Sequence, residues 1–294
     1  MVHYGVPQIG IVMPVYNGEK AIYSSLMSLI KQTFTQWLCI IVNDGSTDKT
    51  IEEIEKIEDE RIILINLEKN MGRGYARKLA LSKLKEFNLL YMCMLDSDDL
   101  CYPDKLSWQF EYMEEHKDVT LTSCSLGYID NSLNLTGVLE ISPKIKEMQY
   151  NLYEKYIMVP HASSIIRMSD IGDITFNEDI LLGEDQDFLI RLLYKKNYVY
   201  IPRIAYLYNR EYSFSLKKYV KSLYFKELYL SRLPISKRYL YKLKIRNQIK
   251  KLIVIILTVL KYEKFYLKKI GRIPDNEEFI YHKKFLNEFI SQKI

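Results

Sequence analysis

The sequence predicts an α/β fold with a mostly parallel sheet flanked by helices, followed by a helical, basic C-terminal extension. Short apolar runs alternate with helical patterns along the first part of the chain, as in successive β-α-β units. The runs are unbroken, which is typical of parallel strands buried on both faces. Polar clusters directly follow them, so we expect a site at the carboxyl edge of the sheet, where open α/β sheets bind ligands.

Strands are expected at the apolar runs that polar or turn residues bound. These runs are 8–13, 37–42, 62–66, 89–95, 119–128, 161–167 and 198–208. Pro202 falls inside the last run, which is therefore expected to form one or two strands. The stretch 141–160 has no pattern that assigns an element.

Helices are expected where apolar residues recur at spacings of three and four. These segments are 19–32, 49–58, 75–87, 108–116 and 188–195. Gly45 permits a tight turn before the second helix, and Ser46, Thr47 or Asp48 can cap it. After residue 213 the pattern becomes helical and basic to the end of the chain, so we divide the chain into a domain at 1–212 and a helical region at 213–294.

Charge is distributed unevenly along the 294 residues, although the formal net charge is only +5. Between Lys217 and Lys269, sixteen Lys or Arg face two Glu, and they are interleaved with Tyr, Leu and Ile. This composition suits a helical surface that lies on anionic lipid. A basic, solvated helical cap is the alternative. No nucleic-acid-binding motif is recognised, so nucleic acid is not an expected partner.

Cysteine usage and the chain termini predict the compartment. The four cysteines include no C-x-x-C pair and are expected to be free thiols in a reducing compartment. The N-terminus lacks a basic segment followed by an apolar one, so no signal peptide is expected. The apolar run 252–260 falls short of the ~20 residues that span a bilayer. The expected location is cytoplasmic, peripheral on the inner face of the cell membrane.

An acidic cluster, Asp96-Ser97-Asp98-Asp99, follows the expected strand 89–95, which is apolar throughout. Three carboxylates so close together repel one another unless a cation lies among them. Hard divalent cations prefer oxygen ligands, and Mg²⁺ typically takes one or two carboxylates together with substrate phosphates. We therefore expect a metal–diphosphate site. The alternative is an acidic turn in which Asp99 caps a helix.

Two further polar residues are expected near this edge. Asp44 ends the second strand, where it can accept a hydrogen bond from a nucleobase N–H or a ribose hydroxyl; a plain turn aspartate is the alternative. The segment from Gly72 begins like G-x-G-x-x-G, but Arg77 occupies the sixth position, which weakens a dinucleotide-binding interpretation. Arg77 can direct its guanidinium at a phosphate or base, or can simply lie on the surface.

The pair Glu184-Asp185 follows a glycine near an expected helix start. A helix N-terminus stabilises a charged carboxylate, which can act as a general base toward a substrate hydroxyl. A capping role is the alternative. Asp187 and Arg191 are four residues apart and can pair. His161 is a possible acceptor contact, although a lone histidine is more often structural.

Taken in order, these motifs resemble the family 2 glycosyltransferases, the large inverting group with the GT-A fold. The resemblance extends roughly from residue 8 to residue 210. The matching segments are Ile11-Val12-Met13-Pro14-Val15-Tyr16-Asn17, Gln32-Thr33-Phe34, 41–48, Asn70-Met71-Gly72 with Ala76-Arg77, 95–99 with Pro103, and Gly183-Glu184-Asp185.

The resemblance implies a role for each matching residue. The nucleotide-sugar would be bound by Pro14, Val15, Tyr16, Asp44, Arg77, Asp96 and Ser97. Of these, Asp44 would hold the base, most often uracil. Asp98 would be the direct ligand of Mn²⁺ or Mg²⁺, with Asp99 as a competitor. Asp185 would be the general base, with Glu184 as the second choice.

The resemblance therefore implies a metal-assisted, inverting hexosyl- or N-acetylhexosaminyltransferase with a Rossmann-like GT-A domain. Its donor would be a nucleotide-sugar, expected to be a UDP-sugar, and its acceptor a hydroxyl of a glycan or lipid-linked molecule in bacterial surface polysaccharide or lipooligosaccharide synthesis. Two alternatives stay open. A nucleotidyltransferase would need a glycine-rich loop bearing Lys or Arg after the first strand, which 14–18 does not supply. A non-catalytic nucleotide-sugar-binding protein would lack turnover.

Overall fold

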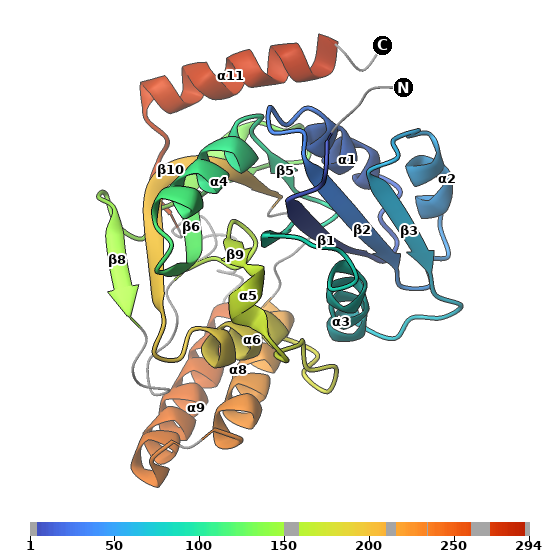
Figure 1. Cartoon of the computed structure of the whole chain (residues 1–294). Helices are drawn as coiled ribbons and strands as arrows, with labels where there is room; N and C mark the ends of the chain where they lie inside the picture. Colours follow the sequence, from blue (N-terminus) through green and yellow to red (C-terminus); the bar gives the residue numbers. More distant parts are fainter. Residues whose placement is uncertain (1–4, 150–158, 210–215, 234, 260–270, 292–294) are drawn as a thin grey trace.

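The computed structural model describes residues 5–149, 159–209, 216–233, 235–259 and 271–291 (Figure 1). Its strands form one sheet in the order β3-β2-β1-β4-β9-β6-β10-β5, with β7 beside β6 and β8 beside β10. Helices flank the sheet (Figure 1). Most of the paired residues lie in parallel pairs, so the predicted α/β fold with a mostly parallel sheet is confirmed.

The first half of the sheet is entirely parallel. Its strands are β1 (Ile9–Val15), β2 (Trp37–Asn43), β3 (Ile62–Asn66) and β4 (Tyr91–Met94), connected through α1 (Ile22–Ile30), α2 (Thr50–Glu55) and α3 (Arg73–Leu84). Every residue of β1, β2 and β4 is buried. Burial on both faces explains the unbroken apolar runs. Because the strands pair in parallel, their carboxyl ends lie at one edge of the sheet.

The second half of the sheet is mixed. Its strands are β5 (Leu100–Cys101), β6 (Val119–Ile129), β7 (Leu135–Leu139), β8 (Lys146–Gln149), β9 (Ile165–Arg167) and β10 (Asn197–Asn209). The helices here are α4 (Lys105–Glu115), α5 (Met168–Ile171) and α6 (Glu184–Leu192). Short β9 pairs antiparallel with both β4 and β6 and so joins the two halves. β10 runs through Pro202 as one strand, with a register shift between Ile201 and Ile204.

Three helices begin earlier than the sequence predicts. α3 does so by two residues, at Arg73, and the differences at α6 and α4 matter for the site. α6 begins at Glu184 instead of residue 188, directly after Gly183, whose φ of +86° reverses the chain. Glu184 and Asp185 therefore lie in its first turn. α4 begins at Lys105, and Asp99 is followed by β5. The alternative in which Asp99 caps a helix is therefore wrong.

The C-terminal region is helical, as expected. It contains α8 (Leu216–Ser231), α9 (Lys237–Val259) and α11 (Asn276–Ser291). α8 and α9 lie beside α6, whereas α11 lies at the far end of the molecule (Figure 1). None of the helices in the described part of the chain is long and apolar enough to cross a membrane. The division at 212/213 stays a prediction, because both residues lie outside the described ranges. Leu260, at the end of the apolar run 252–260, and residues 150–158 of the unassigned stretch 141–160 also lie outside them.

Gly45 generates the first testable prediction. Its φ is +68°, and an added Cβ would lie 2.4 Å from the carbonyl carbon of Lys69. Gly172 also has a positive φ, +53°, but its added Cβ would meet nothing within 4 Å. Gly45→Ala should therefore lower the free energy of unfolding by about 3 kcal/mol, and Gly172→Ala by about 1 kcal/mol. Urea unfolding of both variants measures the difference; equal losses would contradict the proposed steric cause.

Candidate functional site

Two hydrogen bonds connect the loop after β1 to the loop after β2 and to the start of α2. The Asn17 N–H donates to Ser46 Oγ at 2.9 Å, and the Gly18 N–H donates to Thr50 Oγ1 at 2.7 Å. Pro14 and Val15 are buried at the end of β1, whereas Tyr16, the next residue, is 50% exposed. Tyr16 therefore presents its ring at the carboxyl edge of the sheet.

Asp44 lies at the same edge and is not a plain turn aspartate. Its N–H donates to the Val15 carbonyl oxygen at 2.8 Å, which joins it to β1. Its carboxylate is 2% exposed and accepts from the Met71 N–H at 2.6 Å and from the Gly72 N–H at 2.9 Å. Asp44 thereby fixes the loop that leads into α3. The structure thus brings Pro14, Val15 and Asp44 together, as the sequence predicts.

A buried ionic cluster links α3, α6 and the loop after β4. Arg77 donates through Nη1 to Glu184 Oε1 at 2.6 Å and through Nη2 to Asp96 Oδ1 at 2.7 Å. Arg73, one turn earlier on α3, donates through Nε to the same Oε1 at 2.6 Å. The side chain of Arg77 is 5% exposed and that of Glu184 is 0% exposed. Arg77 is therefore not a surface arginine, and Glu184 is already held by two cations.

Electrostatics favour the charged forms of Asp96 and Arg77. Burial acts to raise the pKa of Asp96, but the positive charges of Arg77 and Arg73 outweigh it and hold that pKa below its ordinary value. Burial likewise acts to lower the pKa of Arg77, yet the Asp96 and Glu184 carboxylates raise it overall. Each buried charge is thus compensated by a charge of opposite sign.

The acidic cluster divides into residues with different surroundings. Asp99 is 0% exposed; its carboxylate accepts from the Tyr206 hydroxyl at 2.7 Å and from the Asn209 N–H at 2.8 Å. Burial and the neighbouring charges of Asp98 and Asp96 raise the pKa of Asp99 well above its ordinary range. Asp98 and Ser97, by contrast, are only half-buried. Asp98 is therefore the better placed of the two predicted metal ligands.

The donor groups of this loop are compatible with Mg²⁺ or Mn²⁺. Within the described ranges, no group of three or more His, Cys, Asp or Glu side chains is arranged to hold a metal ion. A cation held by one carboxylate needs most of its ligands from phosphates and water, which is the usual arrangement for Mg²⁺. Asp98 is only half-buried, so solvent reaches this residue. The residues therefore fit a cation that binds together with a diphosphate.

The two remaining predicted residues, Asp185 and His161, lie near the cluster. Asp185 is half-buried in the first turn of α6, next to Glu184. His161 is 3% exposed and packs against the rings of Phe176 and Phe188, which stack on each other, with centroid distances of 5.8 and 5.7 Å. Burial and the nearby charge of Arg77 lower the pKa of His161 to about 3, so its ring is neutral near pH 7. Its burial leaves the predicted acceptor contact without support, and that role stays a prediction.

The sequence analysis missed two residues that organise the site. Arg73 shares the ion pairs of Glu184, and its position four residues before Arg77 on one helix face was the available signal. Tyr206 donates to Asp99, and its hydroxyl also accepts from the Asp96 N–H at 3.1 Å. No local pattern indicates this role, because Tyr206 is 110 residues from Asp96 in the sequence. The predicted pair of Asp187 and Arg191 is confirmed, at 2.6 Å.

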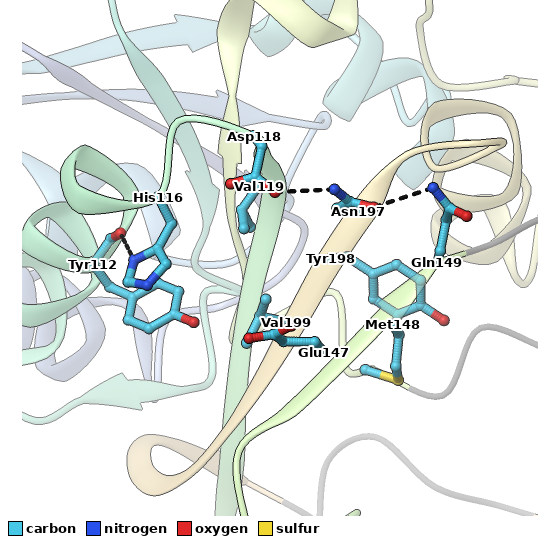
Figure 2. Close-up of a pocket in the computed structure, with 10 residues that line it drawn as sticks. All are labelled: Tyr112, His116, Asp118, Val119, Glu147, Met148, Gln149, Asn197, Tyr198 and Val199. Atoms are coloured by element: carbon cyan, nitrogen blue, oxygen red, sulfur yellow. Dashed lines mark hydrogen bonds between the residues drawn. The ribbon is translucent and has the colours of Figure 1, made fainter.

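A pocket of about 380 Å³ lies elsewhere, where β6 and β10 begin (Figure 2). The stacked rings of Tyr112 and His116 line it, together with Glu147, and Asn197 donates to Asp118 at 3.0 Å. None of the predicted site residues contributes to this pocket. It is therefore separate from the carboxyl edge of the parallel strands.

Comparison with known proteins connects this geometry to a family. The model of glycosyl transferase family 2 matches residues 10–173. An uncharacterised glycosyltransferase of Methanocaldococcus jannaschii is 32% identical over 64% of this chain and 65% of its own length. The Escherichia coli enzyme WfaP, named UDP-Glc:α-D-GlcNAc-diphosphoundecaprenol β-1,3-glucosyltransferase, is 33% identical over 57% of this chain and 64% of its own length. The matches thus span slightly less than two thirds of these relatives.

Solved structures share the fold. The crystal structure of Staphylococcus aureus TarS 1–349 in complex with UDP has a TM-score of 0.60 and 21% identity, and the match covers 80% of this chain and 69% of that one. The mannosyltransferase PcManGT of Pyrobaculum calidifontis, in complex with GDP-Man and Mn²⁺, has a TM-score of 0.58 and 14% identity, over 86% of this chain and 74% of that one. These likenesses confirm the GT-A expectation.

The buried ion pairs yield a second prediction. Glu184→Gln removes the charge that two arginines share, and should lower the free energy of unfolding by about 3 kcal/mol because Arg77 stays buried. The matched control is Glu178→Gln, whose ion pair with Lys78 is 44% exposed on both sides and should cost less than about 1 kcal/mol. Chemical denaturation measures both; similar losses would show that the buried cluster is not specially stabilising.

Proposed function

The chain belongs to glycosyl transferase family 2, and from this membership we propose that it is an inverting glycosyltransferase using a UDP-sugar donor. The observation that supports the proposal is that Arg77 bonds Asp96, two residues before Asp98, to Glu184, the neighbour of Asp185, while Asp44 holds the loop that leads into the helix of Arg77. The TarS structures with UDP and UDP-GlcNAc are consistent with a uridine nucleotide. We propose that the enzyme acts at the cytoplasmic face of the cell membrane, in surface polysaccharide or lipooligosaccharide synthesis.

Asp44 is the proposed contact to the base. Each carboxylate oxygen can accept two hydrogen bonds, so the bonds from Met71 and Gly72 leave capacity for the ring N–H of uracil. Tyr16, which is half exposed next to Asp44, would cover the base and ribose together with Pro14 and Val15. A base acceptor that the protein has already oriented favours uracil over bases without that N–H.

Asp98 is the proposed ligand of Mn²⁺ or Mg²⁺, and Asp99 is assigned a structural role. Bound there, the cation would offset the negative charge that develops on the leaving diphosphate. The ion pair of Asp96 with Arg77 holds the loop after β4 in place. Ser97, which stands between Asp96 and Asp98 in the sequence, would contact the donor. PcManGT, whose structure contains Mn²⁺, offers a parallel within the same fold.

Asp185 is the proposed general base, since Glu184 is occupied by Arg73 and Arg77. Asp185 takes the proton of an acceptor hydroxyl, whose oxygen attacks the anomeric carbon opposite the diphosphate. The new carbon–oxygen bond forms as the bond to the diphosphate oxygen breaks, and UDP leaves with that electron pair. The configuration inverts in one displacement, and no covalent enzyme intermediate is needed. Glu184 is a positioning residue that fixes the first turn of α6.

A lipid-linked or polymeric glycan is the proposed acceptor class. WfaP carries an undecaprenol-linked substrate in its name, and TarS is named as a poly(ribitol-phosphate) β-N-acetylglucosaminyltransferase. Either type of acceptor would present a sugar or alditol hydroxyl to the proposed general base, Asp185. The identity of the transferred sugar follows from a donor screen.

Turnover tests the proposal directly. Purified protein should release UDP from one member of a UDP-sugar panel in Mn²⁺ or Mg²⁺, but not in EDTA. Asp185→Asn should lower kcat by about a hundredfold to ten-thousandfold, because proton abstraction is lost, and should leave UDP affinity unchanged. The exposed Asp173→Asn is the matched control and should retain full activity. Metal-dependent donor binding without turnover, with lipid-linked acceptors supplied, would instead indicate a non-catalytic binding protein.

Base recognition can be tested without turnover. Calorimetry should show that the wild-type protein binds UDP about tenfold or more tightly than 3-methyl-UDP, which lacks the ring N–H. Asp44→Asn should bind UDP about as weakly as the wild type binds the methylated nucleotide, and should discriminate little between the two. A variant that keeps the full preference for UDP would rule out Asp44 as the base acceptor.

A further inference from the structure

Helix α9 presents two different faces. Its inner face carries the buried Leu243, Asn247 and Val254. The Asn247 amide donates to the Leu223 carbonyl oxygen and to Glu227 Oε1, both on α8, at 3.3 and 2.8 Å. The inner face is therefore fully explained by packing against the rest of the protein, where α8 and α9 lie together beside α6 (Figure 1).

The opposite face of α9 is apolar and uncovered. Five large side chains recur there at spacings of three and four, and we call them the outer stripe. They are Tyr241, Ile245, Ile249, Leu252 and Ile256, with exposures of 67, 46, 55, 57 and 48%. At 3.6 residues per turn they share an arc of about 80°, centred about 180° from the inner face. A water-exposed helix face would ordinarily be polar, so the outer stripe indicates an interaction surface.

Basic side chains border the first part of the outer stripe on both sides, and the exposed Ile253 and Ile255 widen it near its C-terminal end. By helical geometry, Lys244 and Lys251 lie along one border, and Lys242 and Arg246 along the other. All four are exposed or half-buried, and α9 contains no Asp or Glu. An apolar stripe between cationic borders matches the interface of an anionic bilayer, with the apolar groups below the headgroups and the cations among them.

The borders also disfavour a second copy of this chain as the occupant. Two stripes packed against each other would bring the lysines and arginines of both helices together without acidic partners on α9, and like charges repel. We propose that the outer stripe of α9 inserts into the headgroup–acyl boundary of an anionic membrane and holds the protein on its surface.

The position of α9 relates this membrane docking to catalysis, and this part of the inference rests on the proposed function. The Tyr229 ring of α8 lies 3.5 Å from where a Cβ of Gly183 would stand, directly before Glu184 and Asp185. Phe225, Tyr229 and Leu243 share one core cluster with Phe188 of α6. The membrane-facing helix is thus packed through α8 onto the helix that carries the proposed base. A lipid-linked acceptor would approach from the side of the protein that already lies on its membrane.

Vesicle flotation tests the docking with the full chain. We expect the protein to float with vesicles of phosphatidylglycerol and phosphatidylcholine, and weakly with phosphatidylcholine alone. The double variant Ile245→Glu/Ile249→Glu should lose about tenfold or more in partition coefficient. The matched control is Ile280→Glu on α11, where Ile280 is 70% exposed but lies far from α9, and it should bind like the wild type (Figure 1).

Site-specific labelling tests insertion itself. The four native cysteines are all buried, so Ile249→Cys can be labelled selectively with an environment-sensitive nitrobenzoxadiazole dye. The expected result is a blue shift and an intensity gain on anionic vesicles, with no change for dye at Ile280→Cys. Residual flotation should persist in high salt, because the apolar contribution is not screened.

Three outcomes would overturn the proposal. The first two are no flotation and flotation that the double variant does not change. The third is a dimer of this chain that light scattering detects and Ile249→Glu dissociates, together with no binding of the protein to vesicles. UDP release with a soluble acceptor separates this question from the proposed function. The double variant should keep that activity. Loss of vesicle binding with turnover intact supports docking, whereas vesicle binding by a protein without turnover would leave docking supported and the proposed enzyme rejected.

Discussion

The ion pairs that Glu184 makes with Arg73 and Arg77 are the interaction on which the candidate site depends. They connect side chains 111 and 107 residues apart in the sequence, and Arg77 extends the connection to Asp96. Because a buried charge is tolerated only with a partner, α3, α6 and the loop after β4 cannot be displaced independently of one another. The donor side and the acceptor side of the proposed reaction are therefore held at a fixed separation by one network.

The parallel half of the fold was predictable because its signals are local. Unbroken apolar runs predicted β1, β2 and β4, and the polar residues that end them placed Asp44 and Asp96 at a common edge. The second half carried weaker signals. β9 was expected within the longer run 161–167 but has only three residues. β5 has two residues, which is too few for any periodicity, and it is stabilised by pairing with the distant β10.

Site roles were harder to predict than site positions. Asp99 and Asp98 are adjacent and chemically identical, and only the distant Tyr206 and Asn209 distinguish them, by burying one carboxylate and bonding both of its oxygens. Likewise Glu184 and Asp185 differ through Arg73 and Arg77, not through any property of their own segment. The start of α6 was predicted too late because the apolar pattern begins only at Phe188, although acidic residues favour a first helical turn. The ion pairs of Glu184 stabilise that turn.

The double attachment of Asp44 has a consequence for the thermodynamics and kinetics of nucleotide binding. Its carboxylate is oriented by Met71 and Gly72 before any ligand arrives, and the neighbouring loop is tied down through Asn17 and Gly18. A binding loop that is ordered in advance loses little conformational entropy on association. An incoming nucleotide would meet a preorganised surface, so that diffusion and desolvation, more than loop folding, would set the association rate.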